Sequence, residues 1–283
     1  MKFVKSLNPN GTYVNLYYED WGIGKPVVFI HGWPLDHQMW EHQRRVLSEH
    51  GLRCIAYDRR GFGKSGKPWT GYNYDTFADD LKAVLDFLDL EDVTLVGFSM
   101  GGGEVVRYFS RHGGNRVSKV VLLSSIAPFT LKTDDNPNGV PKEVFDDIIS
   151  SIEEDRPAFL ASFGKMFYGV NVVSHQVSQA MLDWNLMVAM QASPKATIDC
   201  VHAFGETDFR KEMHTINVPT LVIHGDSDKI VPMEPTGEQA ARLIPDAKFL
   251  VYEDAPHGLF ITDKEQLNAD LLEFIGTETP VEI

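Results

Sequence analysis

The stretch VTLVGFSMGGG, residues 93–103, decides the fold of this 283-residue chain. Residues 93–98 form a short run that is mostly apolar and rich in valine and leucine, which is typical of a buried strand. A glycine-rich segment that opens a helical pattern follows at once, and Ser99 stands between the two. This is the G-x-S-x-G pattern, in which a sharp strand-to-helix turn presents a serine hydroxyl at the edge of a sheet.

The two glycines that flank this serine have a steric explanation. Side chains at Gly97 or Gly101 would clash with the neighbouring strand and helix, so both positions need glycine. The backbone N–H groups after Ser99 lie at a helix N-terminus, where they can stabilise a developing negative charge. The alternative is a glycine-rich turn that carries a serine by chance. The strand-turn-helix context favours a nucleophilic serine.

Similar apolar runs occur on both sides of this motif, and helical patterns such as residues 75–88 lie between them. We expect strands at residues 25–32, 53–58, 93–98, 119–124, 220–224 and 248–252. Short apolar strands that alternate with helices predict an α/β protein with a mostly parallel central sheet flanked by helices. Further helices are expected at residues 236–243 and 264–275.

This alternation stops after about Pro128. Residues 129–213 have helical patterns rich in Phe, Met and Trp, and they contain no convincing strand. We therefore predict a core domain of residues 1–128 and 214–283, with residues 129–213 inserted as a helical cap. Insertions beyond the carboxyl ends of parallel strands are where such sheets bind ligands.

A serine hydroxyl is a weak nucleophile, so it needs a base within hydrogen-bond reach. His257 is expected to be that base, because it follows the last strand at the same sheet edge as Ser99. The chain order Ser…Asp…His agrees with this choice. Asp228 is our candidate for the carboxylate that orients the histidine. Asp226 is expected to cap its turn through its own backbone, and Asp254 is a weaker candidate because it immediately precedes the histidine turn.

The segment His31-Gly32-Trp33-Pro34 follows the first apolar strand, where a second oxyanion donor is expected. The two donors would be the backbone N–H groups of Trp33 and Met100. His31 itself is expected to be structural. Pro34 restricts the conformation of Trp33, so we expect it to influence which nucleophile, water or hydrogen peroxide, is accepted.

Seven motifs together resemble the cofactor-free haloperoxidases (perhydrolases) and the aryl esterases grouped with them, within the α/β-hydrolase superfamily. They are FIHGWPLD (29–36), YDRRGFGKS (57–65), GFSMGGGE (97–104), NGVP (138–141), FYGVN (167–171), HGDSDKIVP (224–232) and APHG (255–258). The resemblance covers nearly the whole chain and implies an α/β-hydrolase fold with a helical cap.

The resemblance also implies residue roles. Ser99, Asp228 and His257 would form the catalytic triad, and the N–H groups of Trp33 and Met100 the oxyanion hole. Guided by it, we assign four residues to an apolar substrate pocket: Trp33, Ile126, Phe163 and Ile230. Most other aromatic residues of the 129–213 segment, such as Phe145, are better explained by core packing. No metal, haem or other cofactor is expected, and related proteins are commonly homo-oligomers.

The composition is ordinary for a globular protein, with 43% hydrophobic and 23% charged residues. The net charge of −14 argues against nucleic acid or an anionic membrane as partner. The partner expected from the proposed triad is a small-molecule ester substrate. Cys54 and Cys200 do not suggest a disulfide framework. We find neither a signal peptide nor a run of about 18 apolar residues, so a cytoplasmic protein is expected.

The sequence thus predicts a serine ester hydrolase, a carboxylesterase or arylesterase that works through an acyl-enzyme. A perhydrolase side activity is expected with it. Two alternatives stay open: a lactam or amide hydrolase with the same triad, and a non-catalytic small-molecule receptor on a hydrolase scaffold. Turnover of a chromogenic short-chain ester would distinguish the receptor from the esterase.

Three other patterns are assigned no function. Residues 61–66 spell G-x-G-x-x-G, but no helix starts there, so a dinucleotide site is not expected. His37 and His42 are five apart, which does not suit one face of a helix binding a metal. Residues 58–60, Asp-Arg-Arg, are interpreted as a turn with local ion pairs.

Overall fold

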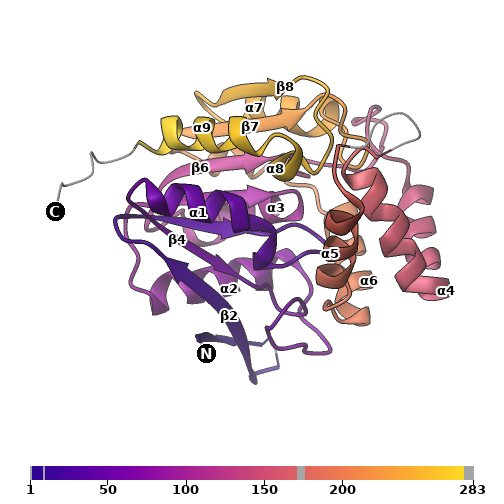
Figure 1. The fold of residues 1–283 in the computed structure, drawn as a ribbon, viewed down its shortest axis with the longest axis horizontal. Helices are drawn as coiled ribbons and strands as arrows, with labels where there is room; N and C mark the ends of the chain where they lie inside the picture. Colours follow the sequence, from indigo (N-terminus) through magenta and orange to yellow (C-terminus); the bar gives the residue numbers. More distant parts are fainter. Residues whose placement is uncertain (1, 9, 171–175, 277–283) are drawn as a thin grey trace.

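The computed structural model describes residues 2–8, 10–170 and 176–276, and it is built around one eight-stranded sheet (Figure 1). The strand order is β1-β2-β4-β3-β5-β6-β7-β8. The strands are β1 (Phe3–Leu7), β2 (Tyr13–Trp21), β3 (Lys25–Ile30), β4 (Leu52–Tyr57), β5 (Val93–Phe98), β6 (Val117–Leu123), β7 (Thr220–Gly225) and β8 (Lys248–Tyr252).

The six strands from β3 to β8 run parallel, which confirms the expected α/β fold. All six residues of β5 are buried, because helices cover both faces of the sheet. In the register of the central strands, Ile30 of β3 pairs with Gly97 of β5, and Gly97 pairs with Leu122 of β6. The carboxyl ends of these strands therefore meet at one edge, where Ser99 lies.

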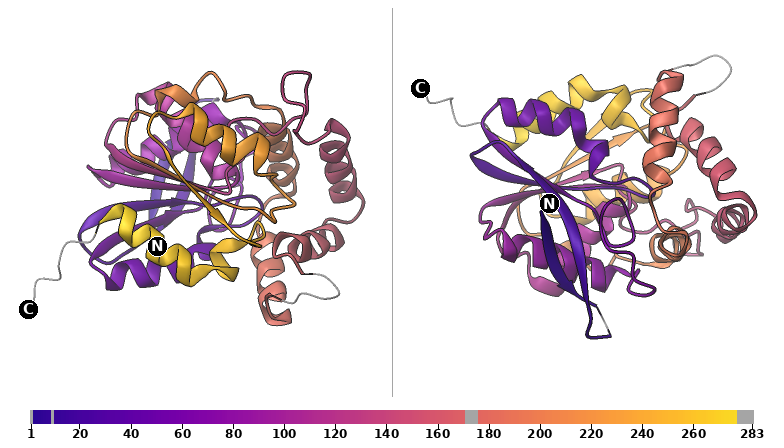
Figure 2. Two further views of the ribbon diagram at one scale, coloured as in Figure 1. Left: turned by 90° about the horizontal axis from the view of Figure 1, so that it is seen from above. Right: turned by 60° about the horizontal axis from the view of Figure 1, so that its bottom comes forward.

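The strands β1 and β2 were not predicted from the sequence. They form an antiparallel hairpin, and β2 also pairs antiparallel with β4. In β2 every second side chain over residues 14–18 is buried, the alternation typical of a strand with one covered face. Figure 2 shows the hairpin extending from one side of the sheet.

Two layers of helices enclose the sheet, as Figures 1 and 2 show. The helices α1, α8 and α9 cover one face, and α2, α3 and α7 cover the other. Their bounds are α1 (Glu41–Glu49), α2 (Tyr74–Phe87), α3 (Met100–His112), α7 (Gln239–Leu243), α8 (Leu259–Thr262) and α9 (Lys264–Ile275). Short helical turns occur at η1 (His37–Trp40), η2 (Met213–Thr215) and η3 (Glu234–Glu238). The side chain of Asn73 caps α2 by accepting the N–H of Thr76.

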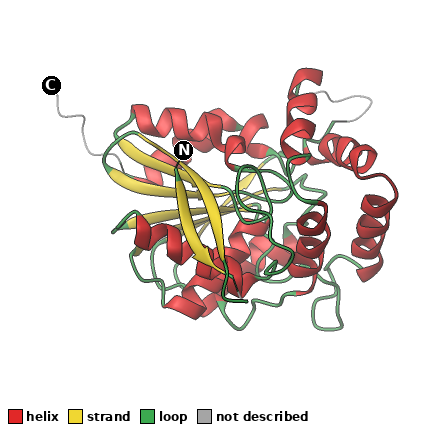
Figure 3. Cartoon of the chain, turned by 90° about the horizontal axis from the view of Figure 1, so that it is seen from below, coloured by secondary structure: helices red, strands yellow, loops and turns green. Residues whose placement is uncertain are grey.

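Three further helices lie between β6 and β7 in sequence and beyond the carboxyl ends of the strands in space (Figures 1 and 3). They are α4 (Lys142–Phe167), α5 (Gln179–Ala189) and α6 (Pro194–Glu206). α4 is interrupted at Asp155, whose φ of −151° and ψ of 84° are not helical. Residues 129–170 and 176–213 thus have the expected helical character, with two isolated β-bridges. Their division from the core as a separate domain stays a prediction.

Cys54 and Cys200 are both buried and unpaired. Among the described residues, no helix combines the length and the apolar character needed to span a lipid bilayer.

Candidate active site

Ser99 lies on a tight turn between β5 and α3. Its φ of 53° and ψ of −119° lie outside the regions that non-glycine residues usually occupy. The turn is held from both sides, since the Ser99 N–H donates to Leu123 O at 2.9 Å and its carbonyl accepts the N–H of Ile126 at 3.2 Å. Ser99 precedes α3, but its hydroxyl does not cap the helix. The hydroxyl is therefore available for another partner.

Close backbone approaches explain the two glycines of this turn. A Cβ added at Gly97 would lie 2.7 Å from the carbonyl oxygen of Gly101, and one added at Gly101 would lie 2.6 Å from that of Ile30. The first clash is with the start of α3 and the second with the end of β3. The steric reason inferred from the sequence is confirmed.

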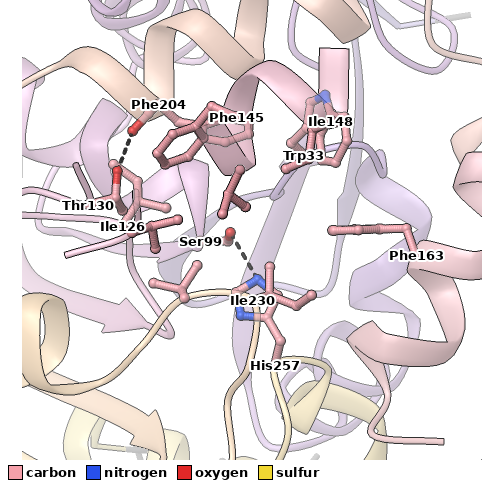
Figure 4. A pocket seen from close by; sticks show the side chains of 13 residues that line it. Trp33, Ser99, Ile126, Thr130, Phe145, Ile148, Phe163, Phe204, Ile230 and His257 are labelled. Carbon is pink, nitrogen blue, oxygen red and sulfur yellow. Dashed lines mark hydrogen bonds between the residues drawn. The ribbon is translucent and has the colours of Figure 1, made fainter. Parts of the chain in front are cut away.

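His257 lies in the loop between β8 and α8, directly opposite Ser99 (Figure 4). Its Nε2 is 3.0 Å from the Ser99 Oγ, and its Nδ1 is 2.6 Å from Oδ2 of Asp228. The imidazole is buried, with the rings of Phe98 and Phe167 packed against it at centroid distances of 4.8 and 4.9 Å. The histidine is thus placed to accept a proton from the serine while its other nitrogen donates to the carboxylate.

Asp228 is buried in the loop that follows β7. Its Oδ1 accepts the N–H groups of Ile230 at 2.9 Å and Val231 at 2.8 Å, and its Oδ2 faces His257. Burial alone would raise the pKa of this carboxyl. The positive charge of a protonated His257 and the ring N–H groups of His224 and His257 outweigh burial and hold the pKa well below its usual value. Asp228 is therefore ionised throughout the ordinary pH range.

The competing carboxylate Asp226 points away from this chain of hydrogen bonds. It is exposed, and its Oδ1 accepts the N–H of Asp254 at 2.8 Å. We expected Asp226 to cap its own turn. It instead ties that turn to the neighbouring loop, which comes just before His257. Asp254 is also exposed, and its backbone takes part in this tie.

The loop after β3 lies against the serine. A Cβ added at Gly32 would be 3.0 Å from the Cβ of Ser99 and 2.6 Å from the ring of Phe98. The carbonyl of Gly32 accepts the N–H of Leu35 at 3.1 Å and bonds the His31 ring at 2.9 Å. These contacts fix the peptide plane whose N–H belongs to Trp33. The N–H of Met100 is the first of α3, where a helix leaves its N–H groups unpaired.

His31 holds this loop from inside the core, as its structural assignment implied. Its Nε2 accepts the N–H of Arg59 at 2.9 Å, so Nδ1 carries the proton that is donated to Gly32 O. Burial, together with the nearby Arg59 guanidinium, holds the pKa of His31 well below its usual value. His31 is therefore neutral, with a single tautomer.

A cavity of about 60 Å³ opens above Ser99 and His257 (Figure 4). All four residues that the sequence analysis assigned to a pocket line it: Trp33, Ile126, Phe163 and Ile230. Seven other residues line the cavity and were not predicted to do so: Thr130, Val140, Val144, Phe145, Ile148, Phe204 and Val231. Six of the seven come from the 129–213 segment, and only Val140 and Val231 lie within motifs quoted above, NGVP and HGDSDKIVP.

The positions of Phe145 and Pro34 relative to the cavity were not predicted from the sequence. Phe145, interpreted as core, contributes to the cavity wall and is largely buried. Pro34 is buried next to Trp33 through a cis peptide bond, and it is not among the described residues that line the cavity. Any effect of Pro34 on the reaction must therefore pass through the Trp33 loop.

A family model of the alpha/beta hydrolase fold matches residues 25–264. The chain belongs to the α/β-hydrolase family. A non-heme chloroperoxidase from Kitasatospora aureofaciens is 47% identical to this α/β-hydrolase over 265 residues, which cover 93% of this chain and 96% of the relative. A bifunctional esterase/perhydrolase from Acinetobacter calcoaceticus is 40% identical over 266 residues, which cover 93% and 96%.

The crystal structure of a bromoperoxidase from Bacillus anthracis matches this α/β-hydrolase with a TM-score of 0.92 and 46% identity. The match covers 97% of this chain and 99% of that chain. The haloperoxidase/esterase resemblance inferred from the seven motifs is therefore confirmed.

The Asp-Arg-Arg stretch at residues 58–60 is not a turn with local ion pairs, and that interpretation was wrong. Arg59 and Arg60 are fully buried and reach distant partners: Arg59 pairs with Glu104 of α3 at 2.8 Å, and Arg60 with Asp80 of α2 at 2.6 Å. Arg59 also donates to His31 O at 2.9 Å. In this α/β-hydrolase, buried charges connect the loop before Trp33 with the helix after Ser99.

One cluster of possible metal ligands lies within the described residues, namely Asp36, His37 and Asp58. Its ligand atoms bond mainly to protein groups. His37 Nδ1 is 2.5 Å from Asp58 Oδ1, and the second Asp58 oxygen accepts the N–H of Lys64 at 2.8 Å. The cluster joins three loops of the α/β-hydrolase by hydrogen bonds, and the expected absence of a metal stays a prediction.

Proposed function

We propose that this protein is a serine carboxylesterase that acts through an acyl-enzyme, with Ser99 as nucleophile, His257 as general base and Asp228 as the acid that orients it. The observation that carries the proposal is the unbroken chain from Ser99 Oγ to His257 at 3.0 Å and from His257 to Asp228 at 2.6 Å, below an apolar cavity. A hydroxyl, a base and an orienting group in this order form an activated nucleophile.

The proposed reaction has two halves. Ser99 Oγ attacks the ester carbonyl while its proton passes to Nε2 of His257, and the oxyanion is stabilised by the N–H groups of Trp33 and Met100. The tetrahedral intermediate collapses, and His257 gives its proton to the departing alcohol. Water then attacks the acyl carbonyl while His257 removes its proton. The bond to Ser99 Oγ breaks, His257 returns the proton to Ser99, and the acyl group leaves as a carboxylic acid.

The cavity favours small, uncharged acyl groups. Among the described lining residues, only Ser99, His257, Thr130 and Trp33 have polar side-chain atoms. The Thr130 hydroxyl already donates to Phe204 O at 2.9 Å, and the Trp33 ring N–H donates to Thr197 O at 3.0 Å. A charged acyl group would lose its hydration there without gaining a partner. We therefore propose esters of short aliphatic acids as substrates.

The test is turnover of p-nitrophenyl acetate, together with a structure of the protein after reaction with a phosphonate ester. We expect turnover and a phosphonate covalently bound to Ser99 Oγ. A protein that binds such esters without cleaving them would instead be the receptor alternative. Cleavage of a lactam at a higher kcat/KM than the ester would favour the amide hydrolase.

A perhydrolase side activity is part of the proposal, supported by the Acinetobacter relative that is named as a bifunctional esterase/perhydrolase. Hydrogen peroxide would replace water in the second half-reaction and give a peracid. We also propose a homo-oligomer, which light scattering can test. The cytoplasmic location expected from the sequence stays a prediction.

Pro34→Leu is expected to lower the ratio of perhydrolysis to hydrolysis. Pro34 restricts the conformation of Trp33, whose carbonyl would accept a hydrogen bond from the second O–H of hydrogen peroxide. The measurement is peracetic acid formed from acetate and hydrogen peroxide, alongside hydrolysis of p-nitrophenyl acetate. An unchanged or higher ratio would contradict the role of Pro34, and this includes an equal fall in both activities caused by collapse of the loop.

The pH profile of kcat/KM is expected to fall on the acid side with a slope of one. Only the neutral imidazole of His257 can accept the serine proton, so protonation of this single ring stops the reaction. The depressed pKa of Asp228 keeps that carboxylate ionised across the same range, so it adds no second ionisation. A flat profile down to mildly acidic pH, with acylation limiting, would argue against a histidine base.

A further inference from the structure

His224 is a buried histidine for which the proposed mechanism has no role. It lies near the end of β7 and is completely inaccessible to solvent. Its Nε2 is 2.9 Å from Val231 O and 3.4 Å from Oδ2 of Asp228. Its Nδ1 has no hydrogen-bond partner and faces Gly237, where an added Cβ would lie only 2.6 Å away.

These contacts define the protonation of His224. A carbonyl oxygen can only accept, so the Nε2 beside Val231 O must carry a proton. A second proton, on Nδ1, would be a buried donor without an acceptor, which is costly. His224 is therefore a neutral ring with one N–H, which faces both Val231 O and Asp228.

That single N–H acts on Asp228 in two ways. It holds the carbonyl of Val231, and the N–H of the same residue donates to Oδ1 of Asp228 at 2.8 Å. It also lies next to Oδ2, the oxygen that accepts from His257. Both oxygens of the carboxylate are thus restrained through one buried ring.

We propose that His224 is a positioning residue for Asp228, whose N–H keeps the carboxylate turned toward His257 during catalysis. The proposal rests on the proposed function. It predicts that His224 affects turnover rather than substrate binding, since His224 does not line the cavity among the described residues.

The test compares His224→Phe with His224→Gln. Phenylalanine keeps a planar ring but has no N–H, whereas the glutamine amide nitrogen can reach the place of Nε2. Thr236→Val is the matched control: the Thr236 hydroxyl is buried, donates to Pro232 O at 2.6 Å next to the same loop, and does not contact Asp228. All variants are assayed with p-nitrophenyl acetate, and thermal unfolding is measured in parallel.

We expect His224→Phe to lower kcat about tenfold, which corresponds to about 1.4 kcal/mol of activation free energy, with KM within about twofold. His224→Gln and Thr236→Val should stay within about threefold of wild-type kcat, although both are expected to unfold at lower temperature. If His224→Phe does not fold, His224→Met replaces it, because the thioether also has no N–H and is flexible enough to fill the space.

Three results would overturn the proposal. The first is a His224→Phe variant whose kcat is as high as that of Thr236→Val, and the second is a His224→Gln variant whose kcat falls as far as that of His224→Phe. The third is a His224→Phe variant whose KM rises while its kcat stays unchanged. Phosphonate labelling of Ser99 in the wild type separates this inference from the proposed function. A wild type that turns over the ester through Ser99 while His224→Phe is unaffected refutes only the role of His224. A wild type without turnover refutes the esterase itself.

Discussion

Ser99→Ala is expected to abolish ester hydrolysis and to leave the fold unchanged. Removing the nucleophile removes the covalent route, which costs a factor on the order of 10⁶ in a serine protease. The substitution deletes one oxygen, whose hydrogen-bond partner is His257, and it removes no helix cap. We therefore expect the free energy of unfolding to change by no more than about 1 kcal/mol.

The measurement is kcat/KM for p-nitrophenyl acetate, with urea unfolding as the check on the fold. Ser125→Ala is the matched control. Ser125 is fully buried one strand away, and its hydroxyl accepts the N–H of Ala127 at 3.1 Å. The kcat/KM of Ser125→Ala should stay within about tenfold of the wild-type value. A Ser99→Ala protein with a tenth of wild-type activity, or equal losses in both variants, would mean that another group is the nucleophile.

The β5–Ser99–α3 unit could be predicted because local chemistry specifies it. An apolar run of six residues forms the strand, and two backbone approaches under 3 Å leave room for nothing but glycine at positions 97 and 101. The same kind of local pattern predicted the other parallel strands. Because parallel strands end at one edge, the sequence also predicted which loops meet there.

What depends on contacts distant in sequence could not be predicted in this way. The sequence gives no partner for Arg59 or Arg60, so local ion pairs were the simplest interpretation, although their partners lie 45 and 20 residues away. The hairpin of β1 and β2 was missed because its short alternating pattern differs from the continuous apolar runs of the buried parallel strands.

The residues that line the cavity also fall into those that local sequence patterns predict and those that depend on distant contacts. Trp33, Ile126 and Ile230 lie on loops beyond the sheet edge, close to recognisable motifs. Val144 and Phe145 lie on α4, where an apolar residue that faces the cavity has the same helical spacing as one that faces the core. Only the docking of α4 over the sheet decides between the two, and that depends on the whole 129–213 segment.

Asp228→Asn is expected to lower kcat by about 10⁴, as in the serine-protease case, whereas Asp226→Asn should change it less than threefold. The reason lies in the donors around Asp228. Two N–H groups, from Ile230 and Val231, require an acceptor at the Oδ1 position, so the asparagine oxygen will take that place. Its NH₂ then faces Nδ1 of His257, which must become the acceptor. The ring proton moves to Nε2, and His257 can no longer take a proton from Ser99.

Asp226→Asn is the matched control because it makes the same chemical change two residues away. The asparagine oxygen can still accept the N–H of Asp254, so the tie between the two loops survives. Both variants are compared with wild type by kcat and by thermal unfolding, over a range of pH. A further check follows from the tautomer: activity of Asp228→Asn should not be restored at mildly alkaline pH, since deprotonating the imidazolium leaves the neutral ring with its proton still on Nε2. If Asp226→Asn proved the more damaging of the two, Asp228 would not be the residue that orients His257.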